Sequence, residues 1–147
     1  MRLSYWLLVA LFTPCAASAG PSGDELTKCF IESSTQENRA ALGRWMFAAI
    51  AANPAVESIA KVSPKTMDDV NASAGAVFMR LLTETCKSQA REAILKEGPE
   101  SLQISFAVLG QATMGELFAN PEVRKAVAGL EKYVDKQKLN ELQAPPK

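Results

Sequence analysis

The chain has 147 residues, 48% of them hydrophobic, and its 16 Lys and Arg residues balance 16 Asp and Glu residues. This length fits one domain with a substantial hydrophobic core and leaves little room for a second. Because there is neither a basic excess nor a stripe of Lys and Arg, we expect no nucleic acid partner and no anionic membrane surface as the main target.

Residues 1–19 have the organisation of a cleaved signal peptide. Arg2 supplies a positive charge, residues 5–12 are almost continuously apolar, and Ala17-Ser18-Ala19 is a small-x-small triplet of the kind that precedes a signal peptidase cut. The apolar segment is shorter than the roughly 20 residues of a membrane span. We therefore expect a periplasmic or secreted protein whose mature chain begins near Gly20.

Cys15 leaves an alternative open, a lipoprotein whose cysteine is acylated after cleavage just before it. That processing prefers a small residue directly before the cysteine and an aliphatic one three positions before it, where Pro14 and Phe12 stand. Beyond Gly20, the longest apolar stretch, residues 45–52, is far too short for a membrane span. Without Arg2, the mature chain keeps 15 of the 16 basic residues against 16 acidic ones, a net charge of −1.

Helix start and stop signals divide the first half of the mature chain. After a flexible start at 21–23, a short helix is expected at residues 24–32. Ser34 and Glu37 have the spacing of a capping box, which opens a second helix. That helix is expected to end near Ala52, because the residue before Pro54 avoids the helical region.

Three further helices are predicted in the second half. Ser63-Pro64 starts a long third helix that continues to about Lys96. A fourth helix is predicted at residues 102–119, and a last amphipathic one over 123–134. The apolar stripe of the third helix is Met67, Val70, Ala74, Val77, Phe78, Leu81 and Thr85. One face of the fourth helix carries Leu102, Phe106, Leu109 and Leu117, and another carries Ile104, Val108, Met114 and Phe118.

The predicted fold is all-α, because strand signals are nearly absent. We expect a compact bundle of about five helices in a single domain at 20–142, followed by a disordered tail at 143–147. A fourth helix that is apolar on two sides belongs in the middle of a closed bundle. This favours a closed bundle over the open hairpin of a helical chaperone.

Cys29 and Cys86 are the two cysteines that remain after removal of the leader. If both are oxidised, their pairing is forced. The bond closes a loop of about 58 residues, for which the chain-entropy estimate is roughly 4 kcal/mol. We expect it to hold the first helix to the bundle, since redox-active cysteines are usually two residues apart near a helix start.

No catalytic, cofactor or metal site is predicted. The chain contains no histidine, which excludes Ser-His-Asp and Cys-His catalysis and leaves two distant thiols as a poor zinc set. Asp68-Asp69 lies in the first turn of a predicted helix, where negative charge complements the helix dipole. The glycines are scattered and form no phosphate-binding loop.

The second helix has the most unusual composition of the chain. Its predicted core stripe is Leu42, Met46, Ala49 and Ile50, beside a row formed by Ala41, Trp45, Ala48 and Ala52. One interpretation is a tightly packed central helix with Trp45 in its core. The other places Arg39 and Arg44 around the indole of Trp45 at the edge of a groove that binds a peptide or an anionic small molecule.

The segment 29–54, with its Leu-Gly-Arg-Trp-Met-Phe-Ala run, resembles a group of small exported proteobacterial proteins of unknown function. Residues 83–86 and 129–135 are similar to the same group. The resemblance implies a periplasmic location and carries no activity and no site residues.

Two functions follow as hypotheses. The first is a non-enzymatic helical protein that binds an envelope protein or peptide through a groove beside the second or fourth helix. The alternative is a small-molecule carrier, or a histidine-free enzyme, with a cavity between helices lined by residues such as Phe47, Phe78, Phe106 and Met114. The oligomeric state stays open.

Overall fold

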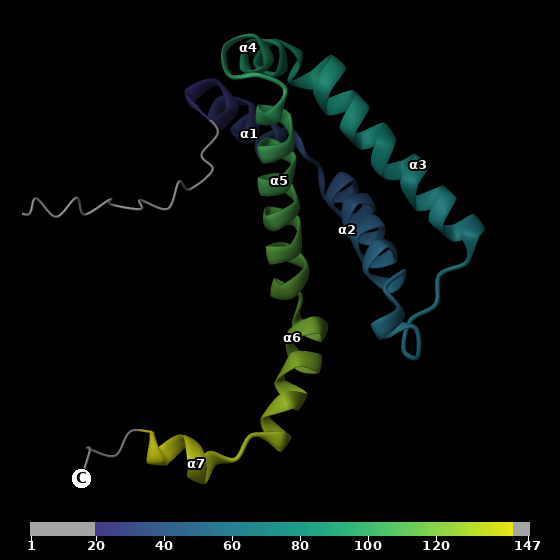
Figure 1. The fold of residues 1–147 in the computed structure, drawn as a ribbon, viewed down its shortest axis with the longest axis vertical. Coiled ribbons are helices and arrows are strands. Elements are labelled where there is room, and N and C mark those ends of the chain that lie inside the picture. Colours follow the sequence, from purple (N-terminus) through teal and green to yellow (C-terminus); the bar gives the residue numbers. More distant parts are fainter. Residues whose placement is uncertain (1–19, 143–147) are drawn as a thin grey trace, which may run out of the picture.

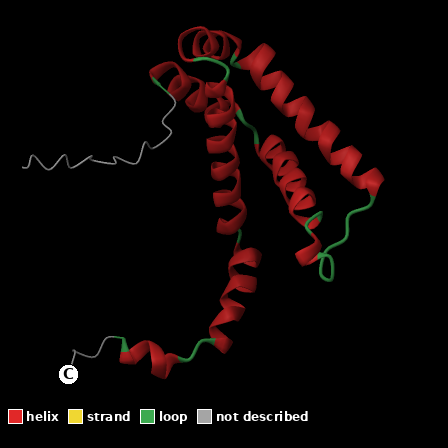
Figure 2. Cartoon of the chain, viewed as in Figure 1, coloured by secondary structure: helices red, strands yellow, loops and turns green. Residues whose placement is uncertain are grey.

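The computed structural model describes residues 20–142, which form seven α-helices with no residue of this range in a strand (Figures 1 and 2). The all-α fold class is confirmed. The signal peptide with Cys15 and the tail at 143–147 lie outside the described residues. The α-helices are α1 (Pro21–Ser33), α2 (Gln36–Ala51), α3 (Pro64–Arg80), α4 (Lys87–Glu97), α5 (Glu100–Ala119), α6 (Pro121–Ala128) and α7 (Lys136–Glu141).

Helices α1 to α5 pack into one compact body (Figure 1). This body differs from the five predicted helices, because the predicted third helix is divided into α3 and α4 and the predicted last helix lies outside the body. α2 and α3 lie side by side, joined by the loop that contains the 3₁₀ turn Pro54–Val56. α1 packs on both α4 and α5, and α5 also packs on α2. Residues 121–142, here called the C-terminal arm, extend away from this body.

The junction of α1 and α2 holds a capping box one residue later than predicted. Thr35 Oγ1 accepts from the backbone N–H of Asn38, and Asn38 Oδ1 accepts from the backbone N–H of Thr35, both at 3.2 Å. Ser34 instead donates its hydroxyl to the carbonyl of Phe30 at 2.6 Å. The predicted pair of Ser34 and Glu37 is wrong because Ser34 closes α1, and the amide of Asn38 replaces a glutamate in the box.

The buried face of α2 consists mainly of Ala41, Leu42, Ala48 and Ala51. Ile50, predicted to face the core, is 55% exposed. Small side chains on the buried face let α2 approach its neighbours closely. At the far side of the loop, Ser63 Oγ accepts from the backbone N–H of Thr66 at 3.1 Å and Pro64 opens α3, as the sequence predicts.

The predicted long third helix is divided by a π-helical turn at Leu81–Thr85. Its first part is α3 and its second part is α4. The backbone N–H of Cys86 donates to the carbonyl of Leu81 at 2.8 Å, so this turn contains one residue more than an α-helical turn. The extra residue moves Thr85, predicted in the stripe, to the surface and places Cys86 in the core.

Cys86 forms a disulfide with Cys29, with the two Cα atoms 6.0 Å apart. The predicted bond is confirmed, and it joins α1 to the start of α4. Three phenylalanines lie close by in the core: the rings of Phe30 and Phe106 stack at 4.7 Å between centroids, and Phe78 meets Phe106 edge-on at 4.5 Å. These contacts link α1, α3 and α5 into one core.

The buried face of α5 is partly polar. Its buried residues recur every four positions and are Ser101, Ser105, Leu109 and Thr113. The Ser105 hydroxyl donates to the carbonyl of Gly23 at 3.2 Å. A small polar side chain, rather than an apolar one, thus fills the contact between α1 and α5. The last turn of α5 leaves the core, with Leu117 38% and Phe118 54% exposed. The expectation that this helix is buried on two sides is therefore wrong at its C-terminal end.

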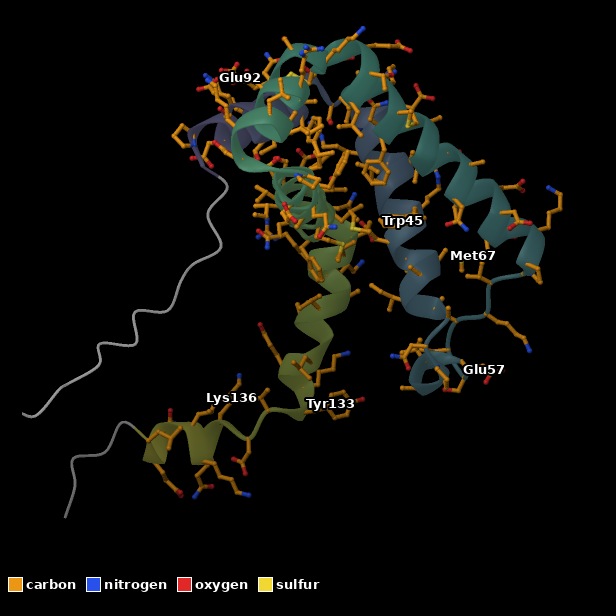
Figure 3. The ribbon with its side chains drawn as sticks, turned by 45° about the horizontal axis from the view of Figure 1, so that its top comes forward. Trp45, Glu57, Met67, Glu92, Tyr133 and Lys136 are labelled. Carbon is orange, nitrogen blue, oxygen red and sulfur yellow. A yellow bond between two sulfur atoms is a disulfide. The ribbon has the colours of Figure 1, made fainter. Side chains whose placement is uncertain are left out.

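The C-terminal arm contributes no buried residue to the core. The predicted amphipathic helix is found here as α6 and the 3₁₀ turn Gly129–Tyr133. Its apolar side chains face solvent, with Val127 54% and Leu130 67% exposed. Tyr133, 86% exposed, projects from the arm at a distance from the body (Figure 3).

Candidate functional site

Arg39, the first of the three predicted binding residues, joins the α1–α2 junction to α5. Its Nη1 donates to the backbone carbonyl of Ser34 at 2.7 Å and to that of Ile31 at 3.4 Å. Its Nε lies 2.8 Å from Oε2 of Glu116, an ion pair by distance that does not have hydrogen-bond geometry. Arg39 therefore makes its contacts within its own chain, and its role is structural.

Trp45 faces α3. Its side chain is half-buried, and its indole Nε1 donates to Oδ1 of Asn71 at 3.0 Å. The indole also meets the ring of Phe78 edge-on, with centroids 5.9 Å apart. Figure 3 places Trp45 in the body, well away from the C-terminal arm. Trp45 thus connects α2 with α3, which agrees with the packing interpretation of this residue.

Arg44 lies in an open groove on another face of α2, here called the α2–α5 groove. The groove has a volume of about 560 Å³ and is formed by α2, α3, the loop between them, the end of α5 and the start of α6. The structure therefore does not bring Arg39, Arg44 and Trp45 together around one ligand position. The lining residues are Ala40, Gly43, Arg44, Phe47, Ala48, Val62, Thr66, Val70, Leu117 and Val123.

The contact between Gly43 and Leu117 shapes one side of this groove. A Cβ placed on Gly43 would lie 3.0 Å from Cδ1 of Leu117, which is tighter than an ordinary van der Waals contact. The missing side chain at Gly43 lets the end of α5 approach α2. The same contact leaves Leu117 lining the groove, where it is still 38% exposed.

The chemistry of the α2–α5 groove is apolar with one positive charge. Arg44 is the single charged residue among those lining it. Phe47, one turn further along α2, is 62% exposed. An apolar segment that carries a carboxylate matches this surface, because it can cover Phe47 and Leu117 while the carboxylate pairs with Arg44.

A second open groove of about 680 Å³ runs along α4. It includes Leu95, which is 71% exposed, and the charged residues Lys87 and Arg91. None of the three predicted binding residues lies on this surface. Its lining residues are Leu82, Thr83, Lys87, Ala90, Arg91, Ile94, Leu95 and Leu102.

The four residues expected to line an internal cavity do not come together around one. Phe78 and Phe106 pack against each other and fill core space with Phe30. Phe47 is on the surface, and Met114 is half-buried on α5. Aromatic residues at helical spacing form core contacts here, so this choice of cavity residues is wrong.

Sequence reasoning missed most of the groove lining, although a signal existed on α2. Ala40, Gly43, Phe47 and Ala48 recur with Arg44 at three- and four-residue steps, which places them on one helical face. The neighbouring row that contains Trp45 has similar spacing, so the sequence alone does not distinguish the two faces of α2. The contributions of Val62, Leu117 and Val123 come from other segments and depend on tertiary packing.

Within residues 20–142, no group of three or more His, Cys, Asp or Glu side chains could hold a metal ion. In the same range, none of the helices is long and apolar enough to cross a membrane.

Comparisons of the chain with models of known protein families, with curated protein sequences and with solved structures gave no match. The resemblance to exported proteobacterial proteins stays a prediction.

Proposed function

We propose that this protein is an exported, non-enzymatic helical protein that binds a segment of another envelope protein in the α2–α5 groove. The observation that carries the proposal is the groove itself, an apolar surface from several elements with Arg44 as its single charge. An exposed apolar surface of this kind is typical of an interaction site. The complementary ligand is an amphipathic segment with a carboxylate beside its apolar face.

Export is supported by two independent features. The leader-like organisation of residues 1–19 favours the secretory route. The bond between Cys29 and Cys86 suits an oxidising compartment such as the periplasm.

The binding proposal is tested by capture from a periplasmic extract of the source organism. The tagged wild-type protein is compared with Phe47→Ser and Arg44→Glu, followed by titration of the captured protein against each variant. We expect each substitution to weaken binding by at least about tenfold, because each removes a central contact of the groove. Arg44→Lys is expected to retain most of the affinity, since it preserves the charge.

Leu95→Ser is the matched control for Phe47→Ser. Leu95 is 71% exposed, similar to Phe47 at 62%, but it lies in the groove along α4. Equal capture by the wild type, Phe47→Ser and Arg44→Glu would reject the α2–α5 groove as the binding surface. Loss of capture with Leu95→Ser alone would move the binding site to α4.

A further inference from the structure

The first helix is fastened to α4 at both ends. Near its C-terminus, Cys29 is bonded to Cys86, which directly precedes α4. Near its N-terminus, α1 meets Glu97, the last residue of α4. The two helices therefore run antiparallel, and their ends are joined by a disulfide at one side and by a carboxylate at the other.

Glu97 caps the start of α1 from another helix. Its Oε1 accepts from the backbone N–H of Ser22 at 2.7 Å, and its Oε2 accepts from that of Gly23 at 2.9 Å. These N–H groups belong to the first turn of α1, which has no capping side chain of its own at Gly20. Pro21 has no N–H, so the carboxylate satisfies the first two backbone donors within α1.

Gly20 lies directly against this carboxylate. A Cβ built on Gly20 would come 2.5 Å from Oε1 of Glu97. A larger residue at position 20 would therefore push the flexible end of the Glu97 side chain away from its present position. The close approach places the backbone of Gly20 beside a negative charge.

We propose that Glu97 receives the α-ammonium group that leader removal creates on Gly20. Cleavage adds water across the Ala19–Gly20 peptide bond, leaving a carboxylate on Ala19 and an amine on Gly20 that takes up a proton. A positive charge at the start of α1 is disfavoured by the helix dipole. Pairing with Glu97 offsets this repulsion and fixes the mature N-terminus to the end of α4. The inference rests on the proposed export.

The test compares wild-type and Glu97→Gln proteins purified from the periplasm, each with its N-terminus identified by mass spectrometry. Glutamine keeps an acceptor for the N–H groups and removes the charge. The ion pair requires a protonated amine, and a free α-amino group has a pKa of about 7.7–8.0. The stabilisation is therefore present at pH 6 and lost at pH 10, where the amine is neutral. We expect Glu97→Gln to lower Tm by about 3 °C at pH 6 and by clearly less at pH 10.

Two controls separate the ion pair from simple capping. Inserting Ser-Gly-Ser between Ala19 and Gly20 moves the ammonium about 10 Å along the chain. In this extended form, the Tm difference that Glu97→Gln causes should not change between pH 6 and pH 10. Glu100→Gln, a neighbouring exposed carboxylate, should show no pH-dependent difference.

Three results would overturn the inference. One is an exported chain that starts at a residue other than Gly20, which also counts against the predicted cleavage position. Another is a processed chain in which the Glu97→Gln difference is the same at both pH values. The third is an equal pH dependence with and without the insertion. The last two leave the proposed export and groove binding intact.

Discussion

At the residue scale, the two arginines of α2 have different roles despite their similar sequence surroundings. Arg39 bonds to two backbone carbonyls and contacts Glu116, whereas Arg44 lies exposed in the α2–α5 groove. We expect Arg39→Ala to lower the free energy of unfolding by about 1–2 kcal/mol, because the carbonyls at the α1–α2 junction lose a charged donor. Urea unfolding of the oxidised protein measures this difference.

Arg44→Ala is the matched control for that measurement. Substitutions of exposed side chains usually change stability by less than about 0.5 kcal/mol. Glu116→Ala should also have a small effect, since the Glu116 side chain is 56% exposed and ion pairs at that exposure contribute little. A loss with Arg44→Ala as large as that with Arg39→Ala would contradict the division of roles.

At the element scale, the sequence predicted helices best where their ends carry local signals. Ser63-Pro64 and Asn53-Pro54 mark the loop between α2 and α3 because capping and proline geometry depend on adjacent residues. The π-helical turn carries no such signal. The three- and four-residue spacing of the apolar stripe of the predicted third helix continues through Leu81 to Thr85. The structure departs from this spacing after Leu81, because Cys86 rather than Thr85 is buried in the core.

The π-helical turn is expected to contain one residue that the disulfide does not need. Deleting Thr83 should convert the turn to an α-helical one, in which Cys86 takes the core-facing position that the regular stripe gives to residue 85. We expect the variant to keep its helical circular dichroism and its disulfide, because Cys86 still faces Cys29. Thiol titration under denaturing conditions, with Thr83→Ala as the control, measures this. A deletion variant with two free thiols would contradict it.

At the scale of the whole molecule, the body was more predictable than the surface used for binding. Hydrophobic periodicity and two cysteines suffice to predict an all-α body with one disulfide. The α2–α5 groove needs Leu117 and Val123 placed beside Phe47, which depends on how α5 emerges from the core. The exposure of the C-terminal arm also depends on tertiary packing. Its apolar stripe predicts burial, whereas the structure buries none of its residues.

The C-terminal arm should behave as a unit separate from the body. Residues 121–142 contribute no buried side chain, so a chain that ends at Asn120 is expected to keep its Tm within about 2 °C. The amides of α6 and α7 should exchange with solvent much faster than those of α1 and α5, because their opening does not require unfolding of the core. Hydrogen exchange measured by mass spectrometry on the full chain, alongside thermal unfolding of the truncated one, tests both expectations. A drop in Tm of about 8 °C or more on truncation, or protection of the arm equal to that of α5, would mean that the arm folds against the body in solution and covers part of the groove.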